Sequence, residues 1–362
     1  MMNQYCELSE LGWDDWFAQR ADCKPPDTVA RVAAVDRDQL LLVDQDGNFR
    51  AKLAGRYLHH RHLSQELPCV GDWVCVEKQS GDDFGVIHAL LERRTSLRRK
   101  SAGTVMEYQM IAANVDYVLI VQSCHFDFNP KRLERYLVMV MEGGAEPYIL
   151  LTKTDLVNPT VLATQLAEIE SIGITVPILP LSNVTRDGLE DVKRLLQPGK
   201  TYCFVGSSGV GKSTLINQLV GRDRMETRSV SWTGEGRHTT VRRELIRLDA
   251  GALVIDNPGM REFGILGAES GIASSYSGIT AFASRCRYQD CSHTGEPGCA
   301  VLAAVHAGEI SQESLDSFLK LKEEAAFNDM SYAEKRKKDR DFGRYIKSAK
   351  KDLRDRYRAH GA

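Results

Sequence analysis

The chain has 362 residues, of which 43% are hydrophobic, and its formal net charge is −2. This length suits two or three domains, and the near-zero charge excludes a generally basic nucleic-acid-binding protein, so that any such binding has to come from local patches. No apolar run approaches the roughly 18 residues of a membrane span, and the N-terminus lacks a signal-peptide pattern. We therefore expect a cytoplasmic protein with no membrane partner.

Residues 1–26 form an N-terminal extension that ends at two consecutive prolines. The extension carries a short apolar cluster: Leu8, Leu11, Trp13, Trp16 and Phe17. Such a cluster forms either a docking helix or an arm packed against the rest of the protein. We expect packing.

Residues 27–100 are predicted to form a small β-barrel. Short alternating runs separated by Gly, Pro and Asp are typical of strands joined by hairpin turns: Val29–Val35, Leu40–Val43, Phe49–Leu53 and Gly71–Val76. About five strands in this length favour an OB-fold, a barrel that often binds RNA. Basic residues cluster at 56–62 and again at 93–100, where they either follow phosphates or form a solvated surface.

Residues 101–270 are predicted to form an α/β domain with a largely parallel sheet, because strand-like and helix-like runs alternate from Asn114 onward. The run 117–121 is strand-like and the run 131–142 is helix-like. Both precede the motifs that carry the chemistry of this domain.

The first of these motifs is Thr152-Lys153-Thr154-Asp155, which follows the apolar run Tyr148–Leu151. It resembles the Asn/Thr-Lys-x-Asp element of GTPases, in which the Asp accepts two hydrogen bonds from guanine and the Lys packs over the base. Ser182 follows a second apolar run, where such proteins place a backbone contact to the guanine oxygen. A site built this way would bind ATP poorly, because another base leaves the carboxylate unpaired. The alternative is a strand-to-helix turn with a capping Asp.

A phosphate loop with the full Gly-x-x-x-x-Gly-Lys-Ser spacing lies between the strand-like run 201–205 and the helix-like run 213–220, the context that its mechanism requires. Backbone N–H groups would surround the β-phosphate, Lys212 would reach the β- and γ-phosphates, and the Ser213 hydroxyl would bind Mg²⁺. The nucleotide-binding residues predicted here are Gly206, Ser207, Ser208, Gly209, Val210, Gly211, Lys212, Ser213 and Thr214.

The order of the two motifs is unusual, because the base-reading motif ordinarily follows the phosphate loop and here precedes it. This order predicts a circularly permuted GTPase. A new connection around residues 183–200 would join the old chain ends, which often lie close together on a domain surface.

Beyond the phosphate loop, Asp256 and Gly259 form an Asp-x-x-Gly motif that would sense the γ-phosphate and hold Mg²⁺ through water. The glycine-bounded segment 234–240 occupies the place of a first switch loop. Thr239 or Thr240 could close on Mg²⁺ when GTP is present. The sequence favours Thr240 only slightly.

The position after Gly259, where many GTPases place a water-orienting Gln, holds Met260. His238 in the switch segment is the nearest titratable candidate to orient the attacking water. The alternative is an ordinary exposed loop histidine. We assign catalysis to His238 and Lys212. Without a positioned Gln, slow intrinsic turnover and an activating partner are expected.

Residues 271–330 contain a candidate zinc site, Cys286-x₄-Cys291-x-His293-x₅-Cys299. Three thiols and one imidazole match a closed, structural tetrahedral site for one Zn²⁺. Disulfide pairing is the alternative, which a cytosolic location disfavours. The other cysteines, at positions 6, 23, 69, 75, 124 and 203, are interpreted as ordinary buried thiols. A helix is expected around 315–322.

Residues 331–362 form a basic tail, with twelve Lys or Arg against four Asp between positions 335 and 358. The tail is either a solvated, partly helical or disordered segment, or an RNA-binding arm that folds on its target. We favour the arm.

Together, the permuted motif order, the segment Gly236–Thr240, Asp256–Gly259, the Cys/Cys/His/Cys spacing and the preceding barrel resemble the ribosome-small-subunit-dependent GTPase A family. The resemblance spans residues 28–350. It implies an N-terminal OB-fold, a permuted P-loop GTPase domain and a C-terminal zinc-binding helical domain. Thr152, where many GTPases have Asn, and Ser182-Asn183, in place of the commoner Ser-Ala, depart from the pattern.

The resemblance also implies an activity: hydrolysis of GTP to GDP and phosphate during late maturation of the small ribosomal subunit, stimulated by that subunit and its rRNA. It points to His238 as the water-positioning residue. We expect a monomer. A nucleotide-gated RNA-binding protein is the alternative, and a small-molecule kinase is disfavoured because the base-reading motif and the zinc module would have no role in it.

Overall fold

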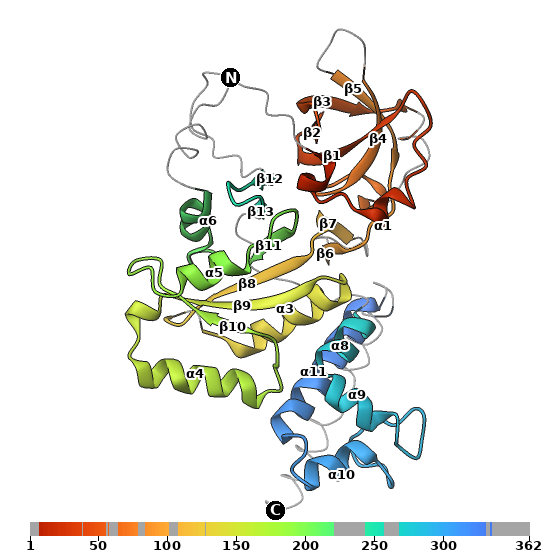
Figure 1. The fold of residues 1–362 in the computed structure, drawn as a ribbon. Coiled ribbons are helices and arrows are strands. Elements are labelled where there is room, and N and C mark those ends of the chain that lie inside the picture. Colours follow the sequence, from red (N-terminus) through yellow and green to blue (C-terminus); the bar gives the residue numbers. More distant parts are fainter. Residues whose placement is uncertain are drawn as a thin grey trace, which may run out of the picture.

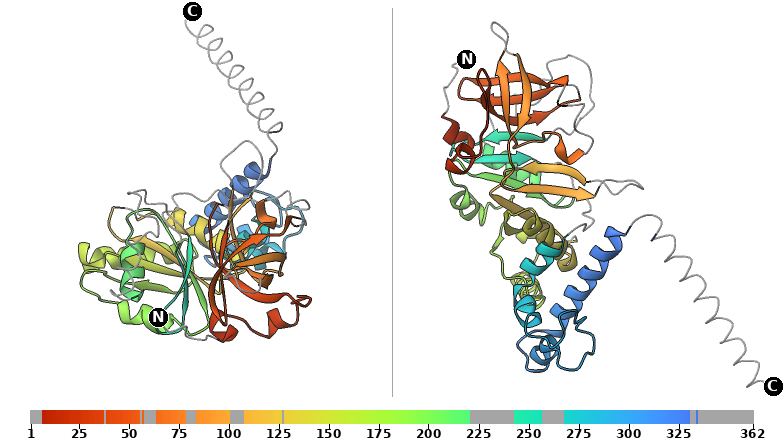
Figure 2. Two further views of the ribbon diagram at one scale, coloured as in Figure 1. Left: turned by 90° about the horizontal axis from the view of Figure 1, so that it is seen from above. Right: turned by 90° about the vertical axis from the view of Figure 1, so that its right-hand side faces the viewer.

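The computed structural model describes residues 7–37, 39–55, 57, 64–78, 84–100, 108–126, 128–220, 243–256, 268–330 and 334. A β-barrel, an α/β domain and a helical domain follow one another along the long dimension of the molecule (Figures 1 and 2). No helix within these described ranges is long and apolar enough to cross a membrane.

The N-terminal arm, residues 7–27, contains η1 (Leu8–Leu11) and the short helix α1 (Asp15–Ala18). Asp14 caps α1 by accepting hydrogen bonds from the N–H groups of Trp16 and Phe17 at 3.1 and 3.4 Å, as is usual for an Asp at this position. Leu11 and Phe17 are buried in one apolar cluster with Trp73 of the barrel. The packing expected for this segment is confirmed.

Five strands close into an OB-like barrel because β1 pairs with both β2 and β4, and β5 pairs with both β3 and β4. The strands predicted from the sequence are confirmed within a few residues, and β5 completes the set. The bounds are β1 (Thr28–Val35), β2 (Leu40–Asp44), β3 (Gly47–Leu53), β4 (Trp73–Lys78) and β5 (Phe84–Leu90), with the short helix η2 (Ser64–Glu66) before β4. Alternate residues, including Leu42, Val74 and Ile87, fill the barrel interior.

A two-stranded sheet, β6 (Ser96–Lys100) with β7 (Tyr108–Ala113), leads from the barrel into the α/β domain. The sheet of that domain has the order β10-β9-β8-β11-β13-β12. All its pairings are parallel except that of β12 with β13, so the complete sheet is mixed. The bounds are β8 (Tyr117–Ser123), β9 (Glu146–Thr152), β10 (Ile178–Pro180), β11 (Thr201–Val205), β12 (Glu244–Arg247) and β13 (Leu253–Asp256).

Helices cover both faces of this sheet and form two separate cores. One core includes Leu133 and Ile169 from α3 and α4, and the other includes Val192 and Leu215 from α5 and α6. The bounds are α3 (Pro130–Glu142), α4 (Pro159–Ser171), α5 (Leu189–Leu195) and α6 (Lys212–Val220), with η3 (Thr154–Leu156) after β9. This layering explains why β8 and β11, buried on both faces, are almost entirely apolar.

The barrel and the α/β domain share one eleven-stranded sheet, since β12 pairs with β1 through Ala34 and Glu244. The buried side chain of Arg31 strengthens the junction. It donates hydrogen bonds to the carbonyls of Gly71 in the barrel, Asn114 before β8, and Leu11 of the arm. Burial lowers the pKa of Arg31 to about 10, so the guanidinium remains charged at neutral pH.

The helical domain packs its own apolar core, which includes Ile272, Leu315 and Phe318. It contacts α3 through hydrogen bonds from the Tyr276 hydroxyl to Glu134 (2.6 Å) and from Arg135 to Glu324 (2.9 Å). The bounds are α8 (Glu269–Ser275), α9 (Ser277–Ala283), α10 (Ala300–His306) and α11 (Gln312–Asp329). Helix α11 confirms the helix expected around 315–322.

One expectation about the cysteines is wrong. Cys23 and Cys75 are joined in a disulfide, with their Cα atoms 5.4 Å apart, whereas both were expected to be free thiols. Packing of the arm brings Cys23 against β4, a contact between residues 52 positions apart in the chain. Cys69, Cys124 and Cys203 are free and buried as expected. Cys6 lies outside the described residues.

Candidate functional site

The predicted phosphate loop connects β11 to the first turn of α6, at the carboxyl edge of the sheet. Its first and last glycines lie close to neighbouring backbone or side-chain atoms. A Cβ at Gly206 would lie 2.2 Å from the carbonyl oxygen of Val121, and one at Gly211 would lie 2.7 Å from the amide nitrogen of Asn183. Both have positive φ, 144° and 101°, a region that favours glycine. The neighbouring strand and loop therefore fix the course of the phosphate loop.

Lys212 is buried at 6% exposure, and its ammonium group is held inside the phosphate loop. It donates a 2.6 Å hydrogen bond to the carbonyl oxygen of Gly206 and another to that of Ser207. The charge is thus positioned where the predicted mechanism needs it, within the loop that would surround a phosphate.

The base-reading motif follows β9, and a side chain of the motif contacts the phosphate loop directly. The hydroxyl of Thr152, which is fully buried, donates its hydrogen bond to the carbonyl of Val210 at 2.5 Å, and the carbonyl of Gln122 lies 3.3 Å from the same oxygen. Lys153 has φ +63°, a left-handed conformation that turns the chain out of the strand into η3. Two segments almost sixty residues apart are thereby held in one loop cluster.

Asp155, the predicted base-reading carboxylate, is exposed and is oriented by the buried Ser182. The Ser182 hydroxyl donates a 2.6 Å hydrogen bond to Asp155 Oδ1 and also accepts from the N–H groups of Val184 and Thr185 at 3.1 Å. Because only one carboxylate oxygen is engaged by Ser182, the other side of the group is available to a base edge.

Asn183 is a positioning residue that sequence reasoning missed. Its side-chain amide donates to the carbonyl of Gly211 at 3.0 Å, and its own backbone carbonyl accepts from the Gln218 amide of α6 at 2.7 Å. The position was noticed in the sequence as a departure from Ser-Ala. Its contact with the phosphate loop depends on tertiary structure and carries no local signal.

Buried polar atoms in this cluster that have no hydrogen-bond partner among the described residues include Ser207 Oγ, Asn183 Oδ1 and Gln218 Oε1. Buried polar atoms are nearly always paired, so unpaired ones at a loop of this shape fit a site that a polar ligand completes. This observation is independent of the motif spacing.

Asp256 ends β13 and is half-buried. Parallel pairing of β13 with β11, in register Phe204 to Asp256, places it beside the strand that leads into the phosphate loop. His238, Thr239, Thr240 and Gly259 lie outside the described residues, as do most of the basic tail, Arg56 and the basic positions 59–62.

The second constellation, in the helical domain, brings together all four predicted metal ligands: Cys286, Cys291, His293 and Cys299. Their ligand atoms lie within 4.8 Å of one another. The distance between the sulfurs of Cys286 and Cys299 is 3.9 Å, and His293 Nδ1 lies 3.7 and 3.5 Å from these two sulfurs. Tetrahedral zinc with ordinary bond lengths requires about 3.8 Å between sulfurs and about 3.6 Å from sulfur to nitrogen. The cluster has the size of a tetrahedral metal site.

The N-terminus of α10 favours the ionised form of Cys286. Cys299 caps this helix by accepting from the N–H of Leu302 at 3.4 Å. Burial opposes ionisation of Cys286, but the N–H groups of Val301 and Ala300 hold its pKa below the usual value. Burial also lowers the pKa of His293, which keeps the imidazole neutral. Thiolate and neutral imidazole are the forms that bind metal.

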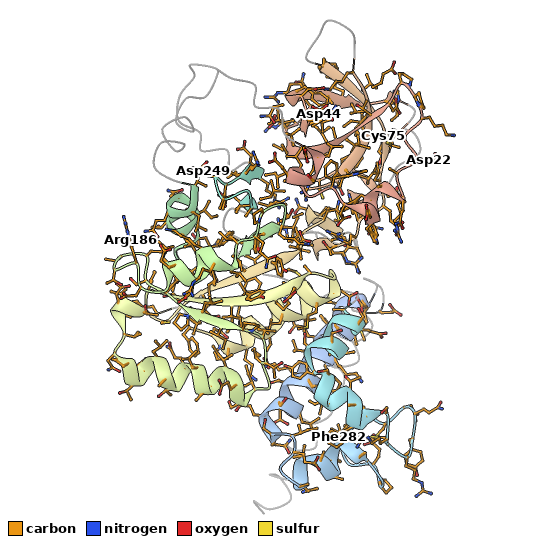
Figure 3. All side chains as sticks on the ribbon, in the orientation of Figure 1. Asp22, Asp44, Cys75, Arg186, Asp249 and Phe282 are labelled. Carbon is orange, nitrogen blue, oxygen red and sulfur yellow. A yellow bond between two sulfur atoms is a disulfide. The ribbon has the colours of Figure 1, made fainter. Side chains whose placement is uncertain are left out.

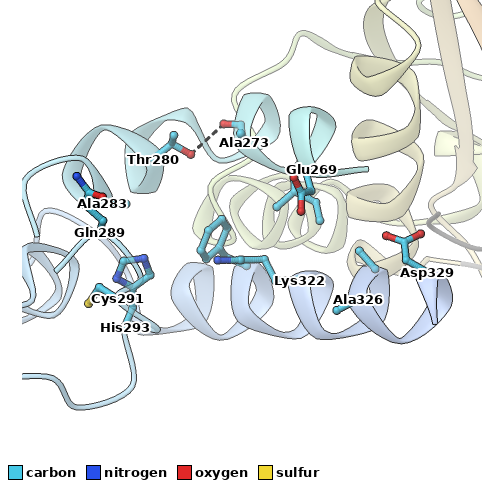
Figure 4. Close-up of a pocket in the computed structure, with 13 residues that line it drawn as sticks. Glu269, Ala273, Thr280, Ala283, Gln289, Cys291, His293, Lys322, Ala326 and Asp329 are labelled. Atoms are coloured by element: carbon cyan, nitrogen blue, oxygen red, sulfur yellow. Dashed lines mark hydrogen bonds between the residues drawn. The ribbon is translucent and has the colours of Figure 1, made fainter. Parts of the chain in front are cut away.

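A cleft of about 450 Å³ lies beside this cluster, between α8–α9 and α11 (Figure 4). Its wall is partly apolar, with Ile272 and Phe318, and partly charged, with Glu269, Lys322 and Asp329. None of its lining residues belongs to the phosphate loop or to the base-reading motif. The cleft is therefore a feature of the helical domain and separate from the predicted nucleotide site.

The phosphate loop follows the central strand of the sheet, and the base-reading loop that contacts it comes earlier in the chain. This arrangement defines the class of circularly permuted GTPases. A solved structure of this class, YloQ, described as a circularly permuted GTPase, is 26% identical with a TM-score of 0.60, over 84% of this chain and 97% of YloQ. YjeQ from Thermotoga maritima has the same fold, with a TM-score of 0.62 at 24% identity over 82% of this chain and 97% of that one.

The chain belongs to the RsgA GTPase family and is a GTP-hydrolysing enzyme. The family model for the RsgA GTPase matches residues 90–266. A relative from Opitutus terrae, named small ribosomal subunit biogenesis GTPase RsgA, is 41% identical over 88% of this chain and 90% of its own length. A relative from Lactiplantibacillus plantarum, named small ribosomal subunit biogenesis GTPase RsgA 2, is 40% identical over 91% of this chain and 92% of its own length.

Proposed function

We propose that this enzyme acts in late maturation of the small ribosomal subunit, and that the subunit and its rRNA stimulate its hydrolysis of GTP. The names of relatives that match along almost the full chain support the process. The hydrogen bond from Thr152 to Val210 holds the base-reading loop against the phosphate loop. This contact is the structural observation that supports GTP as the nucleotide. The proposal includes a cytoplasmic location and action as a monomer.

In this proposal the nucleotide lies along the loop cluster. Asp155 accepts from the guanine edge, Lys153 packs over the base, and Ser182 both orients Asp155 and offers backbone near the guanine oxygen. Thr152 holds the two loops together. The N–H groups of residues 206–214 bind the phosphates.

Hydrolysis proceeds by attack of water on the γ-phosphate, and the chain stabilises the negative charge on the phosphoryl oxygens. Lys212 and the loop N–H groups provide this stabilisation. Ser213 and Thr240 would hold Mg²⁺, which supplies further positive charge at the phosphates when bound. Asp256 and Gly259 sense the γ-phosphate, and His238 orients the water.

The cluster of three cysteines and His293 is proposed to bind one structural Zn²⁺. All four tetrahedral positions are occupied by protein side chains, which leaves none for a substrate. The residues between α9 and α10 form only turns and bends, so the metal would organise a segment that lacks helices or strands of its own.

The pairing of β1 with β12 supports a route from RNA binding to the predicted switch segment. Strand β12 begins at Glu244, four residues after Thr240, and the backbone of Glu244 faces Ala34 of the barrel strand β1. A shift of the barrel on binding RNA would therefore move the strand that leaves the predicted switch. We propose that the subunit uses this connection to bring His238 into place.

The test is hydrolysis of GTP and ATP by the purified full chain, with and without small ribosomal subunits, at fixed salt. We expect GTP-selective turnover that rises strongly with the subunit. Lys212→Ala should abolish it, whereas Lys193→Ala, which changes an exposed lysine paired with Glu190 on the same domain, should not. If hydrolysis were selective for GTP but its rate did not change with the subunit, the proposed partner would be rejected and the assignment of the GTPase site would be retained.

A slowly hydrolysed GTP analogue separates this cycle from a simple binding switch. If hydrolysis times release, the protein should stay on the subunit with the analogue and leave with GTP. Equal release with both nucleotides would show that hydrolysis is incidental to binding.

A further inference from the structure

The N-terminal arm contacts both the barrel and the α/β domain. Its Glu10 pairs with Arg247 of β12 at 3.0 Å, and its Asp14 pairs with Arg94, which also reaches Asp116 at 3.1 Å. On the barrel side, Trp13 and Phe17 pack against Trp73. The arm thus covers the junction between two domains.

The disulfide lies at the far end of this arm and ties it to the barrel. Cys23 follows α1, and Cys75 lies in the middle of β4, paired in the sheet with Val29. Figure 3 places Cys75 on the barrel strand and Asp22, the neighbour of Cys23, at the barrel's outer side. The arm is therefore held at this end by a covalent bond and elsewhere by side-chain packing and ion pairs.

The two cysteine residues differ in their exposure to solvent. Cys75 is 2% exposed and packs in the apolar cluster with Trp73 and Leu91. Cys23 is half-buried and lies between two exposed residues, Asp22 and Lys24. A small thiol or disulfide in solution can reach Cys23, whereas Cys75 is covered while the arm is in place.

We propose that Cys23 and Cys75 form a thiol–disulfide exchange site that reacts with low-molecular-weight thiols and disulfides, and so fixes or releases the arm. In oxidation, the Cys23 thiolate attacks a small disulfide, forming a mixed disulfide and expelling one small thiolate. The Cys75 thiolate then attacks the Cys23 sulfur and expels the second. Two protein thiols are oxidised while one small disulfide is reduced to two thiols, and reduction runs through the same steps in reverse.

Arg20 reports whether the arm is in place, because its side chain is held along the arm. It donates to the carbonyl of Trp16 at 3.1 Å, stacks on the Trp16 ring at 4.3 Å and pairs with Glu92 of the barrel side at 3.6 Å. Arg20 itself is exposed, but Phe17, three residues before it, is 1% exposed. The arm therefore has to leave the barrel before a protease can extend this segment around the Arg20–Ala21 bond. Cleavage there measures opening of the arm, independently of nucleotide or ribosome.

The test uses the whole chain, with zinc supplied, in mixtures of reduced and oxidised glutathione. Free thiols are alkylated and each cysteine is read by mass spectrometry, and limited trypsin cleavage after Arg20 is timed in parallel. We expect Cys23 and Cys75 to change state together, with the mixed disulfide of glutathione found on Cys23. Cleavage should accelerate at least about tenfold once the bond is reduced, since the arm then opens by local fluctuation.

Two variants complete the design. Cys23→Ser should be cleaved rapidly in oxidising and reducing mixtures alike. Cys69→Ser, which changes a buried free thiol of the same barrel, should respond like the parent protein. The proposal is overturned if both thiols stay free in fully oxidised mixtures, if the small thiol attaches first to Cys75, or if cleavage of the parent protein does not change when the bond is broken. The comparison of oxidised and reduced parent protein holds even if a variant fails to fold.

Discussion

The nucleotide-site loops and the metal-ligand loop of the helical domain are ordered in different ways. At the nucleotide site, loops leave strands that are buried between two helical layers, and side chains such as Thr152 and Asn183 bond to the backbone of the neighbouring loop. In the helical domain, the ligand loop runs between two seven-residue helices, α9 and α10, and its four ligand atoms converge on one point. A sheet can hold its loops without a ligand, whereas short helices around a turn-rich loop depend on what the ligands bind.

The largest expected effect comes from removing the metal. Chelation, or Cys299→Ser, should unfold the helical domain, because structural zinc contributes roughly 10–16 kcal/mol of apparent binding free energy to such segments. The α/β domain should stay folded on its own cores. Hydrogen exchange, read separately for α8–α11 and for β8–β11, measures this difference, and zinc content measured by atomic absorption identifies the metal.

Cys124→Ala is the matched control, since it removes a buried thiol outside the cluster. It should retain zinc and cost about 1 kcal/mol of global stability.

Acidification should mimic chelation, because protons compete with the metal for the thiolates and the imidazole. Equal protection of the helical domain with and without metal would remove the contrast between the two regions.

The phosphate loop gives the next largest effect. In Gly206→Ala the new Cβ would meet the Val121 carbonyl oxygen at 2.2 Å, so the loop or the strand must shift. We expect nucleotide affinity to fall by about 3 kcal/mol, or roughly 100-fold, as measured by titration calorimetry. Gly209→Ala tests backbone strain alone, because that glycine also has positive φ but its Cβ would enter open space. Similar losses in both variants would mean that the close approach to β8 is unimportant.

Much of the nucleotide and metal sites could be predicted because their signals are local. The phosphate loop has fixed spacing between a strand and a helix, and the four metal ligands fall within fourteen residues. Chain order alone indicated the permutation. In each case the residue types that carry the chemistry lie next to one another in the sequence.

What could not be predicted depends on contacts between distant segments. The pairing of β1 with β12 joins two domains through one residue pair, and no pattern in either strand specifies the other. The Cys23–Cys75 bond was missed for the same reason, because connectivity cannot be deduced from spacing. Scattered cysteines flanked mostly by apolar residues read as ordinary buried thiols. Asn183 stood out in the sequence as a departure from the Ser-Ala pattern, but the sequence did not indicate that its side chain would contact Gly211 of the phosphate loop.

The helical domain is joined to the α/β domain by a buried hydrogen bond whose loss should have an intermediate effect. Burial, with the nearby Glu134 carboxylate, raises the pKa of Tyr276, so the phenol stays protonated and donates to Glu134. Tyr276→Phe would remove that donor from a carboxylate that is 3% exposed, costing about 2 kcal/mol of unfolding free energy. Tyr288→Phe, at an exposed position, should cost nothing measurable. Denaturant unfolding of both variants decides whether this contact couples the two domains.

The smallest of these effects tests the order of the base-reading loop. Ser182→Ala removes the hydroxyl that donates to Asp155 and accepts from two backbone N–H groups, while the backbone of the loop remains. We expect GTP affinity to fall by about 1 kcal/mol, or roughly fivefold, with ATP affinity unchanged, because Asp155 would lose its fixed orientation toward guanine. Ser171→Ala, on the exposed end of α4, is the control. An equal loss for GTP and ATP would show that Ser182 supports the phosphate loop rather than the base-reading carboxylate, and the two loops would then act as one unit.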